Sequence, residues 1–212
     1  MKNLALVLTA GLASAQGPDD RLNAINKTKI IKIAYRTDAR PFSYLNENKE
    51  PAGYTVDLCK LVARSLEKQL GVPELDIQWV PVTTQTRFEA VANGMADMEC
   101  GSSTATLSRM KQVDFSSFVF IESTGLVVKR DSNIRSFNDL AGKKIAVIAG
   151  TTNERAISEK NQRLNLNASI VEVTDRNDGI AALDRGQRRA PPSVMSAVAL
   201  PAIGFPAPSE PT

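Results

Sequence analysis

The strongest constraint on the fold is an alternation of strand and helix patterns over the first half of the chain. Residues 30–35, 77–82 and 95–100 have the apolar or β-branched character of strands. Apolar residues recur at helical spacing over 55–70, and a shorter helix is predicted over 87–93, before Gly94. This order predicts an α/β lobe with a largely parallel sheet, in which ligands gather at the carboxyl ends of the strands.

A second, shorter round of the same alternation follows. Two extended runs, 118–121 and 125–129, precede a capped turn and short helix over 136–142. The patterns then predict a strand, a helix, a strand and a helix at 144–148, 152–160, 169–173 and 178–185. We therefore place a first lobe at 28–124 and a partial second lobe at 125–187.

The end of the chain has a different composition. From Pro191 on it holds six of the 11 prolines and shows no sustained periodicity. Proline has no N–H to donate to a helix or a sheet, so we expect no packed element there. Residues 188–212 are assigned to a disordered tail rich in proline and alanine.

The N-terminus has the pattern of a secretion signal. A lysine, an apolar run and a small-residue cleavage site occupy residues 1–15, and the alternative is a buried N-terminal strand or helix. Export would place the protein in the periplasm, where disulfides persist. Cys59 and Cys100 can then form a single disulfide, or they can remain as two buried free thiols.

Composition excludes several classes of function. The chain has no histidine, which removes Ser-His and Cys-His nucleophile pairs and zinc sites that need imidazole. Its net charge of +3 is not gathered into a long basic run, so nucleic acid is not expected as a partner. We expect no metal, no cofactor and no catalytic residue.

The most informative segment is 99–109, which follows the third strand. Gly101 allows the backbone to approach a ligand closely, and Ser102, Ser103 and Thr104 supply hydroxyl groups. The guanidinium of Arg109 suits a carboxylate because its planar fork donates two parallel hydrogen bonds. The alternative is that the hydroxyls only cap a helix and that Arg109 is a solvated surface charge.

Two other helix starts resemble this segment in chemistry. Thr84 and Arg87 follow the second strand, and Thr151 follows a strand of the second unit. Arg36 ends the first strand and can join them, unless it is an exposed strand-end charge. Several hydroxyl-rich helix starts after strands, spread over both lobes, favour one anion held in a shared cleft.

Several motifs together resemble the periplasmic glutamate/aspartate-binding proteins of ABC importers, in solute-binding protein family 3. They are RTDARPFSY, GYTVDLCK, PVTTQTR, ECGSSTATLSR, VDFS, SFNDLAGKKIAV and AGTTNE, in this order between about residues 29 and 186. The resemblance implies a type II periplasmic-binding-protein fold, whose two α/β lobes close on one amino acid like a hinge. It implies a monomer that delivers glutamate or aspartate to a membrane permease.

The resemblance also implies roles for the site residues. Arg109 would hold the α-carboxylate with Ser102 and Thr104, while Arg36, Arg87 and Thr84 would face the side-chain carboxylate. Thr151 would contact the ligand from the second lobe.

The chain departs from the family pattern in two places. Arg176 stands near the position of a usual histidine, and nothing after about residue 186 resembles the family strand whose acidic residue pairs with the ligand ammonium. We therefore expect an incomplete second lobe, a truncated or frameshifted product, weak or absent binding and a tendency to aggregate. Two alternatives are a non-functional product and an exported enzyme of the same fold, similar to cyclohexadienyl dehydratase, for which Asp97 and Glu99 are the nearby acid-base groups.

Overall fold

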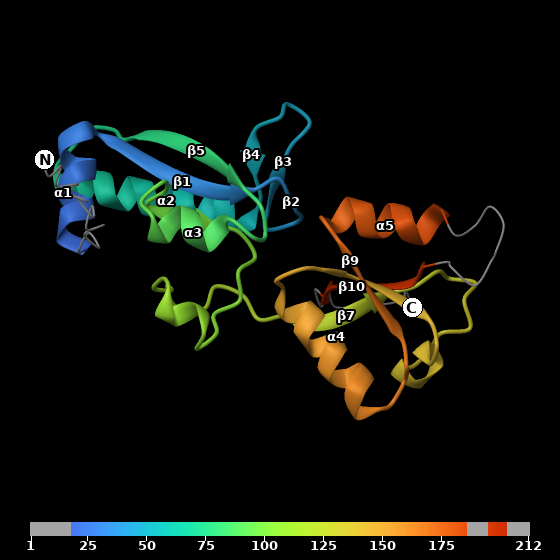
Figure 1. Cartoon of the computed structure of the whole chain (residues 1–212). Helices are drawn as coiled ribbons and strands as arrows, with labels where there is room; N and C mark the ends of the chain where they lie inside the picture. Colours follow the sequence, from blue (N-terminus) through green and yellow to red (C-terminus); the bar gives the residue numbers. More distant parts are fainter. Residues whose placement is uncertain (1–17, 186–194, 203–212) are drawn as a thin grey trace, which may run out of the picture.

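The computed structural model describes residues 18–185 and 195–202 and has two α/β lobes side by side (Figure 1). The predicted signal peptide and most of the predicted tail lie outside the described residues. The first lobe contains α1 (Pro18–Thr28), β1 (Ile30–Arg36), β2 (Asp38–Ala39), β3 (Ser43–Leu45), β4 (Pro51–Ala52), α2 (Tyr54–Leu70), β5 (Asp76–Val82), α3 (Arg87–Ala92) and β6 (Met98–Cys100).

The main sheet of the first lobe has the order β5-β1-β6, and β1 is parallel to both neighbours, as the alternation predicts. Ile31 and Ile33 of β1 are fully buried, and Ala63 of α2 packs against them. Helix α2 ends where Gly71 adopts φ 65°, a left-handed conformation that glycine reaches without steric cost. The parallel order brings the ends of β1, β5 and β6 to one edge.

Cys59 and Cys100 form a disulfide that joins α2 to the last residue of β6. Of the two alternatives left open by the sequence, the structure therefore has the bridge. Cys100 is the residue directly before the segment of Gly101 and the three hydroxyl residues. The disulfide thus fixes the start of this segment to the core of the first lobe.

Helix α1 is not predicted by the sequence pattern, because its composition is largely polar. Its position is set by Arg21, whose guanidinium donates hydrogen bonds to the carbonyl oxygens of Val91, Ala96 and Asp97. These acceptors lie about 70 residues away in the sequence, so a local pattern does not reveal them.

The second lobe is reached through a short 3₁₀ helix, η1 (Arg109–Lys111), and the segment 112–122, which contains no strand. The predicted extended run 118–121 is part of this connection, and Phe118 and Ile121 are 79% and 87% exposed. The lobe then contains β7 (Ser123–Val127), η2 (Phe137–Leu140), β8 (Lys144–Ile148), α4 (Thr152–Arg163), β9 (Ser169–Val173), α5 (Arg176–Arg185) and β10 (Met195–Ala202).

The prediction of no packed element after Pro191 was wrong for residues 195–202. Strand β10 lies inside the second sheet, whose order is β7-β10-β8-β9. It is antiparallel to β7 and parallel to β8. The core beside this sheet includes Leu140, Ile145 and Ile157. Among the described residues, no helix is both long and apolar enough to cross a membrane.

Candidate functional site

A small polar cavity lies between the two lobes, where the strand ends of the first lobe face the start of α4. It contains every binding residue predicted from the sequence except Ser103, which instead lines the neighbouring cavity described below. Its lining consists of Arg36, Thr84, Arg87, Ser102, Thr104, Arg109, Glu122, Ile148, Thr151, Thr152, Asn153 and Arg176.

Arg36 and Arg87 are buried, with 4% and 3% of their surfaces exposed, so neither is a solvated strand-end or helix charge. Nε of Arg36 donates to Oδ1 of Asp38 at 2.8 Å, and its Nη2 donates to Oδ2 at 2.7 Å. Asp38 therefore neutralises much of the charge of Arg36. By contrast, Nε of Arg87 is buried and has no hydrogen-bond partner among the described residues.

The environment of Arg87 is strongly perturbed. Burial lowers the pKa of Arg87 to about 10, Glu99 opposes this shift, and the nearby charges of Arg109 and Arg36 add to it. A buried cation with an unpaired donor is unfavourable unless an anion joins it. The geometry thus favours a negatively charged ligand beside Arg87.

Arg109 bridges the two lobes. Its Nη1 donates to the carbonyl oxygen of Thr104 at 2.8 Å, and its Nη2 donates to the carbonyl oxygen of Gly150 at 3.0 Å. The guanidinium also lies 4.9 Å from the centre of the Phe88 ring, and Arg87 lies 4.8 Å from the same ring. Phe88 is therefore an apolar support shared by two cations, a contribution that the sequence patterns did not reveal.

Glu99 is a second charged group in this cluster, although it does not line the cavity. Burial raises the pKa of the Glu99 carboxyl, and Arg87 opposes this rise most strongly. The neighbouring Gly101 has no room for a side chain, because a Cβ there would overlap the Glu99 carboxylate and lie 3.3 Å from Cγ of Arg36. The glycine therefore lets the backbone run directly past the buried Glu99 and Arg36.

The hydroxyl groups differ in how many hydrogen bonds they already make. Oγ1 of Thr84 and Oγ of Ser103 are buried without a partner among the described residues. Thr151 caps α4, since its hydroxyl accepts from the Glu154 amide at 3.1 Å and donates to the Ile148 carbonyl at 2.7 Å. For Thr151 the structure thus has the capping role that was the alternative reading of such helix starts.

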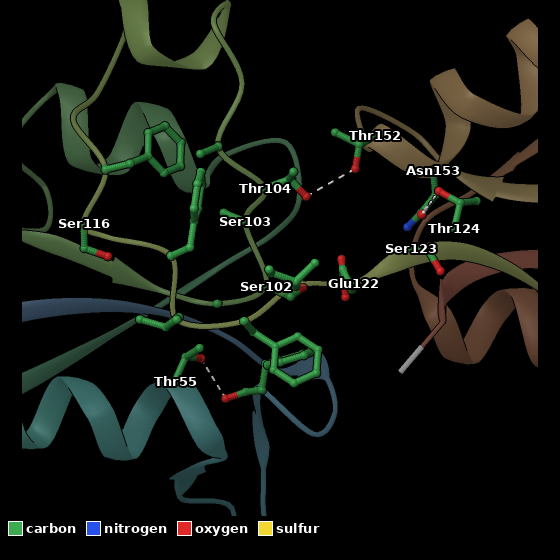
Figure 2. Close-up of a pocket in the computed structure, with 18 of the residues that line it drawn as sticks. Thr55, Ser102, Ser103, Thr104, Ser116, Glu122, Ser123, Thr124, Thr152 and Asn153 are labelled. Carbon is green, nitrogen blue, oxygen red and sulfur yellow. Dashed lines mark hydrogen bonds between the residues drawn. The ribbon is translucent and has the colours of Figure 1, made fainter. Parts of the chain in front are cut away.

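The two lobes also meet through hydroxyl groups and through Arg176. Oγ1 of Thr104 lies 3.3 Å from Oγ1 of Thr152, a contact that Figure 2 marks across the two sides of the cavity. Arg176 lines the cavity and donates from Nη1 to the carbonyl oxygen of Arg40 at 2.5 Å. These contacts leave a cavity volume of about 30 Å³, enough for one or two water molecules. An amino acid can enter only if the lobes move apart.

A larger cavity of about 620 Å³ adjoins this site (Figure 2). Its lining is mainly the segment 115–124, with Phe42 on one side and Asn153 and Ala156 of α4 on the other. Phe42 and Phe120 pack with their ring centres 5.0 Å apart. Among the described residues, no group of three or more histidine, cysteine, aspartate or glutamate side chains could hold a metal ion.

Sequence comparison finds one family. The description "Bacterial extracellular solute-binding proteins, family 3" matches residues 31–190. The L-glutamate/L-aspartate-binding protein of Pseudomonas aeruginosa PAO1 is 38% identical over 189 residues, which cover 87% of this chain and 63% of that protein. The glutamate/aspartate import solute-binding protein of Escherichia coli K12 is 33% identical over 188 residues, covering 87% and 62%. The chain thus spans somewhat less than two thirds of these relatives.

Structure comparison finds the same kind of protein. The ancestral amino acid-binding protein AncCDT-1, a precursor of cyclohexadienyl dehydratase, superposes with a TM-score of 0.71 and 26% identity, over 85% of this chain and 73% of that one. The arginine-bound form of a truncated ArgBP from T. maritima gives a TM-score of 0.71 and 26% identity, over 85% and 77%. These neighbours confirm the predicted type II periplasmic-binding-protein architecture.

Proposed function

Because the chain belongs to family 3 of the bacterial extracellular solute-binding proteins, we propose that it captures glutamate or aspartate in the periplasm for an ABC permease. The relatives named for glutamate and aspartate support this choice of ligand, and the cluster of arginines supports it independently. In this proposal the chain acts as a monomeric binding protein and not as an enzyme.

One observation carries the choice of an acidic ligand: the buried Arg87 guanidinium has a free Nε in a cavity that three other guanidiniums also line. A neutral side chain cannot balance this charge. A carboxylate can, because it accepts two parallel hydrogen bonds from an arginine and carries the opposite charge. Glutamate and aspartate bring two such groups.

The two carboxylates are assigned to different arginines. Arg109, with Ser102 and Thr104, receives the α-carboxylate, and Arg87, with the unpartnered hydroxyl of Thr84, receives the side-chain carboxylate. Arg36 has a smaller share, since Asp38 already occupies its Nε and Nη2. Thr151 contributes mainly by capping α4, whose N-terminus faces the cavity from the second lobe.

Titration calorimetry with glutamate, aspartate, glutamine and arginine tests the proposal. We expect glutamate or aspartate to bind, and glutamine to bind at least about 10-fold more weakly than glutamate, because an amide leaves Arg87 without a counter-charge. Arg87→Met should weaken glutamate binding at least about 30-fold, while the matched change Arg155→Met removes an exposed arginine and should have no effect. Equal or tighter binding of arginine or glutamine would refute the assignment.

A further inference from the structure

We propose that Glu122 accepts the ammonium group of the bound amino acid. This inference rests on the proposed function and adds the group that the arginines cannot supply. An amino-acid ligand brings a cation as well as carboxylates, and a buried cation needs an anionic or strongly polar acceptor. The sequence predicted no such acceptor in this chain, and for that reason it predicted weak or absent binding.

Glu122 lies where the chain crosses from the first lobe to the second, directly before β7. Figure 2 shows it at the junction of the two sides of the site, between Ser102 of the first lobe and Ser123 at the start of β7. Among the described residues, it is the single acidic residue that lines the cavity with Arg87 and Arg109. It is therefore placed to face a ligand held by both arginines.

The carboxylate of Glu122 has an unused acceptor. Its Oε2 is buried and makes no hydrogen bond with any described residue. Leaving a buried carboxylate oxygen unpaired costs more than leaving a neutral acceptor unpaired, so a donor from outside the chain would be favourable there. An ammonium group supplies three N–H donors and the opposite charge.

The other acidic groups near the cavity are already committed. Asp38 is held by both donors of the Arg36 fork. Glu99 lies among the arginines but outside the cavity lining. Arg176 is the charged group nearest in effect to Glu122, yet its Nη1 is directed to the Arg40 carbonyl oxygen and no hydrogen bond joins it to Glu122.

The charge of the whole cluster fits the same assignment. Arg36, Arg87, Arg109 and Arg176 supply four positive charges, and Asp38, Glu99 and Glu122, when ionised, supply three negative charges. The remaining single positive charge matches the net charge of glutamate or aspartate. Removing the charge of Glu122 would match the site instead to a dicarboxylate that has no ammonium group.

The test compares two ligands in two variants of the full chain. Glutarate has both carboxylates of glutamate and lacks its ammonium group. We expect Glu122→Gln to weaken glutamate binding about 10- to 100-fold in titration calorimetry and to leave glutarate binding unchanged or tighter. The matched control Glu172→Gln removes a charge from the exposed side of β9 and should change neither affinity.

Each other outcome contradicts a different statement. If glutamate binding is unchanged in Glu122→Gln, or if glutamate and glutarate weaken equally, the role of Glu122 is refuted while the proposed function stands. If the unmutated chain binds no acidic amino acid, the proposed function fails and the inference fails with it. Should Glu122→Gln not fold, Glu122→Asp carries the same test, because it keeps the charge but withdraws it by one methylene. It should weaken glutamate and spare glutarate.

Discussion

Reduction of the Cys59–Cys100 disulfide removes the covalent link between α2 and β6 of the first lobe. The two cysteines are 41 residues apart in the sequence, and loop-closure entropy for a loop of this length corresponds to about 4 kcal/mol of stability. Cys100 is 2% exposed and packs with Ile31 and Ile33, so the reduced thiol can stay in the core as a small apolar group. We therefore expect a loss of about 4 kcal/mol without a change of fold.

The assay is urea unfolding followed by the fluorescence of Trp79, the one tryptophan of the chain. Trp79 lies in β5 and packs against Tyr35 with a ring-centre distance of 5.9 Å, so it reports on the lobe that contains the disulfide. Reductant should lower the unfolding midpoint of the native chain but not of a Cys59→Ala, Cys100→Ala double variant. A loss below about 1 kcal/mol, or two free thiols in the unreduced unfolded chain, would refute the reasoning.

Three further predictions concern the site. Arg109→Lys keeps the charge but loses the fork, and should weaken glutamate binding about 10- to 100-fold in calorimetry, whereas Arg155→Lys should not. Thr151→Val removes the cap of α4 and should cost about 1 kcal/mol of local stability, seen as faster amide exchange in its first turn, while Thr151→Ser should not. Burial raises the pKa of Glu122 against the opposing effect of Arg176, so acidification protonates it early. Glutamate affinity should therefore fall more steeply toward acid pH than glutarate affinity, and the Glu122→Gln variant should lose that difference.

The alternation of strands and helices was predictable because these segments are specified locally. The helix expected over 55–70 is α2, at Tyr54–Leu70, and the strands expected over 144–148 and 169–173 are β8 and β9. Their apolar spacing is a property of neighbouring residues and is visible in the sequence. Helix α1 was missed because what holds it is Arg21 in a distant contact, not an apolar face.

Strand β10 was missed because the prolines near it were taken as evidence against a sheet. The register explains why Pro201 is tolerated. The pairing of β10 with β8 ends at Val198, whereas its pairing with β7 continues through Pro201 and Ala202. Pro201 thus lies where β10 has a neighbour on one side only, a position in which a missing N–H need not leave a carbonyl unpaired.

The arginines of the site were predictable and Glu122 was not, for a physical reason. Arg36 and Arg87 follow or end strands of a parallel sheet, so topology alone brings them to one edge. Glu122 lies in the crossover, where no periodic pattern fixes its direction. Its surroundings come from Ser102 on one side and from Asn153 and Arg176 of the second lobe on the other, and only the packed lobes bring these together.

The contacts that close the empty site also bear on how a ligand can close it. The Nη2 group of Arg109 donates to the Gly150 carbonyl across the cavity, and this donor is one that the ligand carboxylate needs. A charged acceptor forms a stronger hydrogen bond with a guanidinium than a carbonyl does, so exchanging Gly150 for a carboxylate favours the bound state. The Thr104–Thr152 contact joins two neutral hydroxyls at 3.3 Å and resists separation only weakly. Opening the lobes should therefore subtract little from the affinity, and the balance of charge among the arginines, Glu99 and Glu122 should decide which ligand is held.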